Sequence, residues 1–250
     1  MSNPFNVLWL SASPSLQCLN RPLQRLLLPY ANIRHWQYYQ DLDEASSAFK
    51  AVDLLRTYLS TCEQPLHLIG HGLSGTIGLL YARQYPEKVK SLTLLSVAAQ
   101  PGITWHSHYY AQRHLLPCSR QQVLAQTVRN LFGSKSPYPV KALVHALEQD
   151  LEKTPCLQSL FNTFEYPKGG IVSPLMVCGS RTDSVVDLNA QSAWLPWLKT
   201  KDVLWSCQEG YHFFHYFHPQ LVGEKILRFW NNTTRELRPI DRVDSSTQVV

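Results

Sequence analysis

The chain has 250 residues, of which 44% are hydrophobic and 16% charged, with a formal net charge of +5. This length and composition predict one globular domain with an insertion, and they exclude general disorder. Apolar runs stay short of the roughly 18 residues that a membrane helix needs, and the first residues carry no secretion signal. Lys and Arg are spread singly, so a nucleic-acid surface is not expected.

Strand-like and helix-like segments alternate through the first part of the chain. Short apolar runs at 6–10, 32–39, 65–70 and 89–98 are typical of strands, and the segments between them have helical spacing. Strict alternation requires parallel strands joined by crossover helices. The sequence therefore predicts an α/β protein with a doubly wound, mostly parallel sheet and helices on both faces.

The alternation stops from about 101 to 170, where the pattern predicts several helices. Residues 119–133 open with a Ser cap, and residues 139–153 carry apolar side chains at helical spacing. We expect this insertion to form a helical lid. Strand and helix patterns then return and end in a last helix from Pro219 to Trp230. We expect one domain over 1–230 and a polar, loosely held tail over 231–250.

The segment LIGHGLSGTIGLLYARQYPEKVKSLTLLS, residues 68–96, resembles the nucleophile elbow of the α/β-hydrolase superfamily. In that family a strand ending in G-H is followed at once by the nucleophile, then by L-G-G and a helix. The resemblance covers about residues 5–230 and implies the α/β-hydrolase fold with a helical lid. The nucleophile position falls on Gly72, so the serine that the family places there is replaced by glycine.

Two later segments resemble the family's other catalytic loops, in the order nucleophile, acid, base. PLMVCGSRTDSVVD places the acid at Asp183, and EGYHFFHYFHPQLV places the base at His212. Tyr211 departs from the pattern, because the family has glycine directly beside the histidine. Asp183 has an alternative interpretation as a helix cap. The resemblance also implies an oxyanion hole from the backbone N–H groups of Leu73 and Ser13, although Ser11-Ala12 stands where the family has His-Gly.

The glycine at position 72 leaves three functional hypotheses open. Without an attacking oxygen no acyl-enzyme forms, so the first is a catalytically silent protein that binds a small apolar ligand or a protein partner. The second is an enzyme in which His212 and Asp183 act as a general base alone. The third is an esterase that uses Ser74, although two residues into the helix its side chain is expected to point away from the site.

Aromatic and histidine side chains near these loops are candidates for the pocket lining. His71 precedes the elbow and is expected to pack beside the site, as is Phe213. Aromatic residues at the start of the lid either line an apolar pocket or form lid core. The residues concerned are Trp105, Tyr109 and Tyr110.

Cysteine and histidine spacing gives no sign of a metal or cofactor. His212, His215 and His218 fall three apart, but Pro219 opens the next helix, so packing is favoured over metal binding. No dinucleotide, phosphate-loop or zinc motif is present. The cysteines lack C-x-x-C spacing, which indicates free thiols in a cytoplasmic protein. They are Cys18, Cys62, Cys118, Cys156, Cys178 and Cys207.

Overall fold

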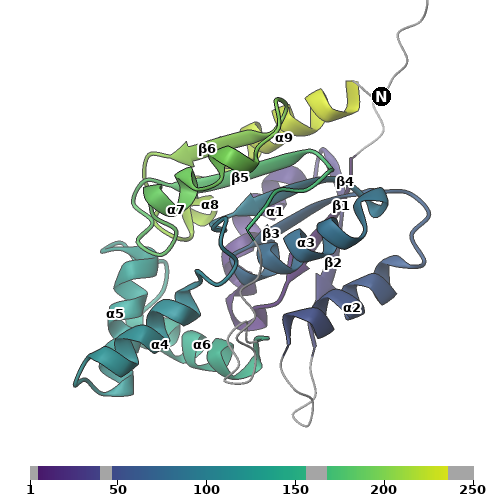
Figure 1. The fold of residues 1–250 in the computed structure, drawn as a ribbon. Coiled ribbons are helices and arrows are strands. Elements are labelled where there is room, and N and C mark those ends of the chain that lie inside the picture. The colour runs from purple at the N-terminus through teal and green to yellow at the C-terminus, as the bar shows by residue number, and fades with distance from the viewer. Residues whose placement is uncertain (1–4, 40–46, 156–167, 236–250) are drawn as a thin grey trace, which may run out of the picture.

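The structure is a computed structural model and describes residues 5–39, 47–155 and 168–235. Its centre is a six-stranded parallel sheet with strand order β2-β1-β3-β4-β5-β6 (Figure 1). The strands are β1 (Phe5–Ser11), β2 (Ala31–Gln37), β3 (Leu66–His71), β4 (Val89–Leu95), β5 (Leu175–Ser180) and β6 (Val203–Cys207). This confirms the predicted α/β-hydrolase fold with a doubly wound sheet.

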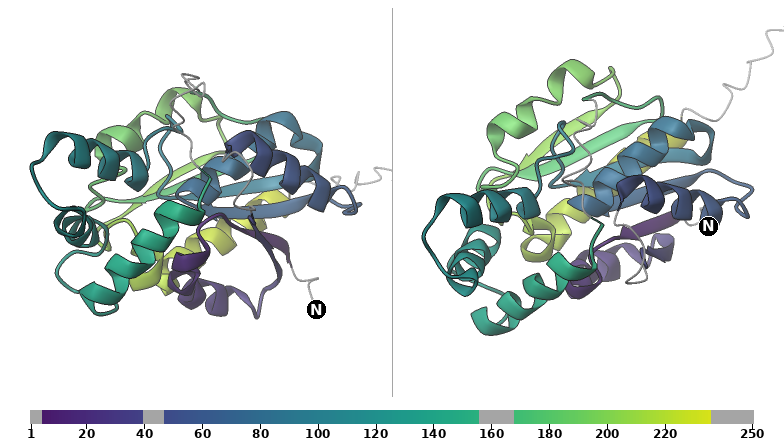
Figure 2. Two further views of the ribbon diagram at one scale, coloured as in Figure 1. Left: turned by 90° about the horizontal axis from the view of Figure 1, so that it is seen from below. Right: turned by 60° about the horizontal axis from the view of Figure 1, so that its bottom comes forward.

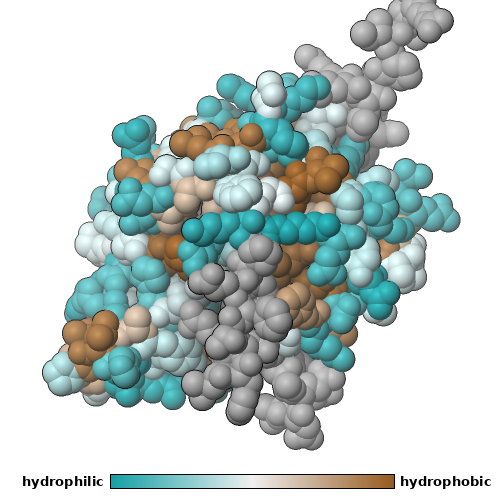
Figure 3. All heavy atoms as spheres, in the orientation of Figure 1, coloured by the Kyte–Doolittle hydropathy of each residue, from teal (hydrophilic) through white to brown (hydrophobic). Residues whose placement is uncertain are grey.

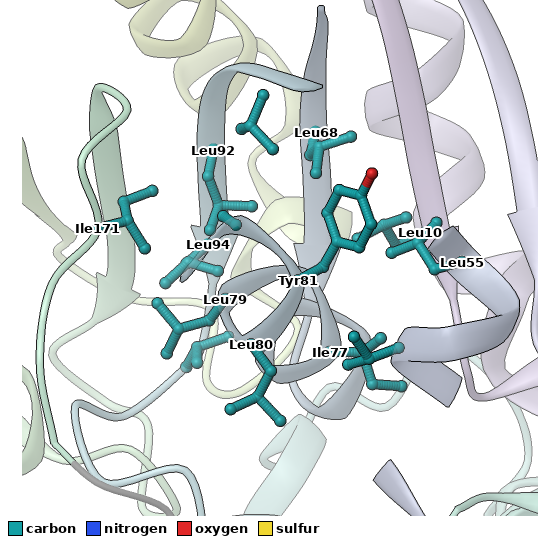
Figure 4. Packing of buried hydrophobic residues seen from close by; sticks show 14 of the residues in the cluster. Leu10, Leu55, Leu68, Ile77, Leu79, Leu80, Tyr81, Leu92, Leu94 and Ile171 are labelled. Atoms are coloured by element: carbon teal, nitrogen blue, oxygen red, sulfur yellow. The ribbon is translucent and has the colours of Figure 1, made fainter. Parts of the chain in front are cut away.

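Helices cover both faces of the sheet, because the buried strands carry apolar side chains on both sides. On one face α2 (Ala48–Leu59) and α3 (Leu73–Gln84) pack on the sheet; the side chain of Tyr81 on α3 lies toward those of Leu10 and Leu68 on the strands (Figure 4). On the other face lie α1 (Arg21–Leu27) and α9 (Pro219–Arg235). The shorter elements are η1 (Pro14–Asn20), η2 (Pro86–Lys88), α7 (Leu188–Ser192), η3 (Leu195–Trp197) and α8 (Phe214–Phe217).

The insertion forms helices α4 (Trp105–Leu115), α5 (Arg120–Phe132) and α6 (Val140–Lys153). These helices gather at one end of the molecule, beside the loops that follow the strands (Figure 2). A third apolar cluster joins them to η1 and to the loops that carry Val185 and Phe213. The lid helices therefore rest on the very loops for which catalytic roles are expected.

The segment boundaries differ from the expectations at two places. At the start of the insertion a helix, α4, begins where the sequence analysis marks no helix start. The Thr104 side chain accepts from the Ser107 N–H, and the Ser107 side chain accepts from the Thr104 N–H. The last helix continues past Trp230 to Arg235, and the rest of the expected tail lies outside the described residues.

Two further expectations concern cysteines and membrane helices. The cysteines within the described ranges are free thiols, and Cys156 lies outside those ranges. None of the helices in the described part of the chain has both the length and the apolar character that crossing a bilayer requires.

Candidate functional site

The turn between β3 and α3 brings Gly72 into a left-handed backbone conformation. Its φ is +50° and its ψ −125°, backbone angles that residues other than glycine rarely adopt. The turn is also tight, since a Cβ on Gly70 would lie 2.5 Å from the Cα of Gly75. Glycine at these positions lets the strand and the helix approach each other, as the sequence predicts. This turn lies beside β1, where the strand order reverses, a common place for ligand sites in α/β sheets.

Asp183 and His212 form a buried pair beside this turn. The Nδ1 atom of His212 lies 3.0 Å from Oδ2 of Asp183, and the two residues are only 1% and 3% exposed. The other carboxylate oxygen accepts hydrogen bonds from the backbone N–H groups of Val185 and Val186. Asp183 thus holds the turn that follows it and orients the imidazole, whereas the helix cap of α7 is Asp187.

Electrostatics keep Asp183 ionised. Burial pushes the pKa of its carboxyl up, but the charge of His212 and the hydrogen bonds from His212 and two backbone N–H groups outweigh burial and leave the pKa below its usual value. A carboxylate only accepts hydrogen bonds, so Nδ1 of His212 carries the proton. In the neutral imidazole, Nε2 then holds a lone pair.

The backbone of His212 is fixed from three sides. Its N–H donates to the carbonyl of Leu131 on the lid helix α5, and its carbonyl accepts from the Ser96 hydroxyl and from Nε2 of His71. Tyr211, the residue that departs from the family pattern, has a φ of +54°. Its N–H donates to the Thr182 hydroxyl, which ties the histidine loop to the loop of Asp183. Tyr211 therefore stands in a strained backbone conformation that glycine would adopt more easily.

The free nitrogen of His212 faces Gly72. A Cβ built on Gly72 would lie 3.7 Å from Nε2 of His212, and this buried nitrogen has no hydrogen-bond partner among the described residues. A hydroxyl attached to that Cβ would come within the reach of about 2.6–3.2 Å that joins a nucleophile to its base. Nε2 of His212 therefore faces the position that a side chain at residue 72 would occupy.

Ser74 points to a different partner. Its Oγ accepts a hydrogen bond of 2.8 Å from the backbone N–H of Ala12, and the residue is 4% exposed. Ala12 follows β1, in the loop for which the second oxyanion donor is expected. This hydrogen bond ties the loop after β1 to the start of α3, and the predicted donor residue, Ser13, lines the adjoining cavity.

A small cavity lies between the elbow and the lid, with about 20 Å³ of space for a water-sized sphere. This is room for water rather than for an acyl chain. Of the pocket candidates, His71, Trp105 and Phe213 line this cavity, together with Leu73. Tyr109 does not, because it is buried in the lid core, and Tyr110 is 46% exposed on the surface.

The histidines spaced three apart have separate partners. Nε2 of His215 lies 2.9 Å from the side-chain oxygen of Asn20, and His218 is 3.8 Å from a carboxylate oxygen of Glu209. Within the described residues there is no cluster of three or more His, Cys, Asp or Glu side chains that would hold a metal ion. Burial, and then the charge of His212, lowers the pKa of His215 to about 3, so it stays neutral.

Three contributors to this site escaped the sequence reasoning: Ala12, Ser96 and Asn20. Ala12 supplies a backbone N–H, which no side-chain motif reveals. Ser96 has a φ of +49°, a conformation that nothing in its neighbours signals. Asn20 lies far from His215 in the chain, so only the folded structure brings them together.

The sheet, the elbow and the lid together define an α/β-hydrolase-fold protein, and residues 61–155 match the family model of the alpha/beta hydrolase fold. The chain is 48% identical to the uncharacterized protein alr2406 of Nostoc sp. over 240 residues, which are 96% of this chain and 95% of the relative. It is 38% identical to the uncharacterized protein sll0249 of Synechocystis sp., over 90% of each chain. The chain belongs to the same α/β-hydrolase-fold family as these cyanobacterial proteins.

Solved structures with the same fold include lipases and esterases. A bacterial membrane phospholipase A has a TM-score of 0.71 at 16% identity, with 94% of this chain and 81% of the other covered. A putative lipase from Acinetobacter baumannii gives 0.71 at 16%, covering 94% and 86%. The naproxen esterase of Bacillus subtilis gives 0.67 at 14%, covering 92% and 85%. At these identities the likeness shows the fold alone.

Proposed function

We propose that this protein binds a small, mainly apolar ligand beside His212, in a cavity that widens from its water-sized volume when the lid helices move outward, and that it forms no acyl-enzyme. One observation carries the proposal: Nε2 of His212 faces Gly72, which has no oxygen to activate. The hydroxyl of Ser74 accepts from Ala12 instead, so it blocks an oxyanion donor rather than acting as a nucleophile. The attacking oxygen is therefore missing, and one N–H of the loop after β1 is already engaged.

The chemistry of the ligand is inferred from the cavity walls. Apolar side chains form one part of the walls, Ser11, Ser13 and Asn20 form another, and the buried Nε2 of His212 needs a hydrogen-bond donor; the apolar side chains are those of Leu16, Leu73, Trp105 and Phe213. A small apolar molecule with one hydroxyl or amide N–H satisfies both. The burial of His212 favours such a molecule over a protein partner. On the face in Figure 3 the hydrophobic patches are separated by hydrophilic side chains, so this face offers no continuous apolar surface for a partner.

A second candidate function is general-base chemistry without a nucleophile. It is favoured by the ionised Asp183, which fixes the Nδ1–H tautomer of His212 and leaves its other nitrogen free to take a proton from a bound molecule. A site that served binding alone would not need this orientation of the imidazole.

Ester hydrolysis separates these functions. We expect the purified protein to release p-nitrophenol from acetate and octanoate esters no faster than its Ser74→Ala and His212→Ala variants. Turnover that disappears in Ser74→Ala would overturn the proposal in favour of an esterase. Turnover lost in His212→Ala but kept in Ser74→Ala would favour the general base. His145→Ala, on the exposed side of α6, is the matched histidine control.

Binding is measured with phenol, an apolar ring with one hydroxyl donor. In a sample with ¹⁵N-labelled histidine, the Nε2 signal of His212 should shift in a saturable way as phenol is added, and the signal of His145 should not. A His212 signal that stays constant throughout the titration would contradict the binding function.

A further inference from the structure

A second and much larger cavity lies outside the site described above. It has a volume of about 260 Å³, opens to solvent and is lined by the C-terminal ends of β1 and β2 together with η1 and α1. Trp9 pairs with His35 and Ser11 pairs with Gln37 across the two parallel strands, so these side chains share one face of the sheet. The cavity approaches the size of small-molecule pockets, which begin at about 300 Å³.

The walls of this cavity are polar at a place where the sheet face is otherwise apolar. Earlier on the same strands, Val7 and Ala31 belong to the apolar cluster under α1 and α9. Around the cavity the chain instead supplies the amides of Gln17, Gln24 and Gln37. Amides both donate and accept hydrogen bonds, which matches the hydroxyl groups of a ligand.

The indole of Trp9 lies buried beside this cavity. Trp9 lines the cavity and is 1% exposed, yet its Nε1–H has no acceptor among the described residues. An unsatisfied buried donor costs about 1–3 kcal/mol. The nitrogen is closed off from solvent, so the indole would report a ligand in the cavity through a change in its surroundings rather than through a new hydrogen bond.

Charge selects among oxygen-rich ligands. Arg21 lines the cavity, and no Asp or Glu is found among the described residues of its walls. A guanidinium without a neighbouring carboxylate binds the planar carboxylate of a ligand through paired N–H groups.

We propose that this cavity binds a small hydroxylated carboxylate beside the ring of Trp9, with the carboxylate on Arg21 and the hydroxyls on the glutamine amides. This site is distinct from the cavity at His212, although Ser11 and Asn20 line both. Because Asn20 also contacts His215, the two cavities share a wall that is hydrogen-bonded to the histidine loop.

The test uses D-gluconate as the probe and sorbitol, which has hydroxyls but no carboxylate, as its neutral counterpart. The chain has seven tryptophans, and Trp9→Phe identifies the Trp9 indole signal in the ¹⁵N spectrum of the full-length protein. We expect gluconate to shift that signal in a saturable way and sorbitol to leave it in place. A signal unmoved by gluconate, or moved equally by sorbitol, would overturn the proposal.

Arginine variants test the role of charge. Arg21→Ala should raise the Kd for gluconate about tenfold, which corresponds to about 1.4 kcal/mol. Arg25→Ala, an exposed position on the next turn of α1, is the matched control and should leave the Kd within about twofold. Equal effects of the two variants would overturn the assignment. His212→Ala should still bind gluconate, so failure at either cavity is recognised separately.

Discussion

Restoring a serine at the elbow should create a hydrolase, and a second substitution should strengthen it. The first variant is Gly72→Ser, and the second adds Ser74→Gly, which together restore the S-L-G-G order of the family pattern. A Cβ at position 72 lies 3.7 Å from Nε2 of His212, so the new hydroxyl comes within hydrogen-bond reach of the base. The single variant therefore gains a nucleophile but keeps Ser74 on the N–H of Ala12.

The expected magnitudes follow from these two contacts. Losing one oxyanion donor costs about 10²–10³ in kcat, or about 2.7–4 kcal/mol, so the double variant should exceed Gly72→Ser by up to that factor. A side chain at a φ of +50° costs about 1–3 kcal/mol of folding free energy. Gly72→Ser should therefore unfold at lower urea concentration than the wild type.

The assay is release of p-nitrophenol from p-nitrophenyl acetate, whose short acyl group needs the least widening of the cavity. The triple variant Gly72→Ser, Ser74→Gly, His212→Ala is the control and should lose the gained activity. Equal rates for the single and the double variant would refute the role given to Ala12. Inactivity of both folded variants would refute the claim that His212 and Asp183 are arranged as a working base.

Three other predictions concern stability. Burial is the main cause that lowers the pKa of His67 and of His215 to about 3. Below about pH 6.5 these imidazoles bind protons in the unfolded chain but stay neutral in the folded one, so the free energy of unfolding should fall by about 1.4 kcal/mol per pH unit for each histidine as the pH drops. A free energy of unfolding from urea melts that stays constant down to about pH 4.5 would contradict this prediction. Gly70→Ala places a Cβ 2.5 Å from the backbone of α3 and should cost about 1–3 kcal/mol in urea melts, whereas Gly102→Ala, with nothing within 4 Å, should cost little. Asp150→Ala removes a fully buried carboxylate that accepts a hydrogen bond from Ser15 of η1 and lies 3.2 Å from Nε2 of His106 on α4. The substitution should lower the free energy of unfolding by about 3–5 kcal/mol and speed hydrogen exchange in the lid. Unchanged hydrogen exchange would refute this anchoring role of Asp150.

Much of the fold could be predicted because its signals are local. The β3–α3 segment contains a strand, a glycine turn and a helix in one continuous stretch, and tight packing at Gly70 and Gly75 leaves few other arrangements. Parallel strands must also present their C-terminal loops at one edge of the sheet. For that reason Gly72, Asp183 and His212 meet in space, although they are far apart in the chain.

The contacts that decide the chemistry of the site were beyond sequence reasoning. The bond from Ala12 to Ser74 joins the loop after β1 to the first turn of α3, its two residues are 62 positions apart in sequence, and it involves a backbone donor. The exposure of Tyr110 and the burial of Tyr109 depend on the rotation of α4 about its axis, which is set by packing on α5. The polar cavity at Trp9 arises only where two strand ends meet η1 and α1.

Covalent labelling with a fluorophosphonate, read by intact-protein mass spectrometry, tests the central claim most directly. The reagent reacts with a hydroxyl only where a base activates it. The account predicts no mass increase for the wild-type protein and one adduct, at position 72, for the double variant Gly72→Ser, Ser74→Gly. A stoichiometric adduct on Ser74 of the wild type would contradict the account, because it would show that the site retains a working nucleophile.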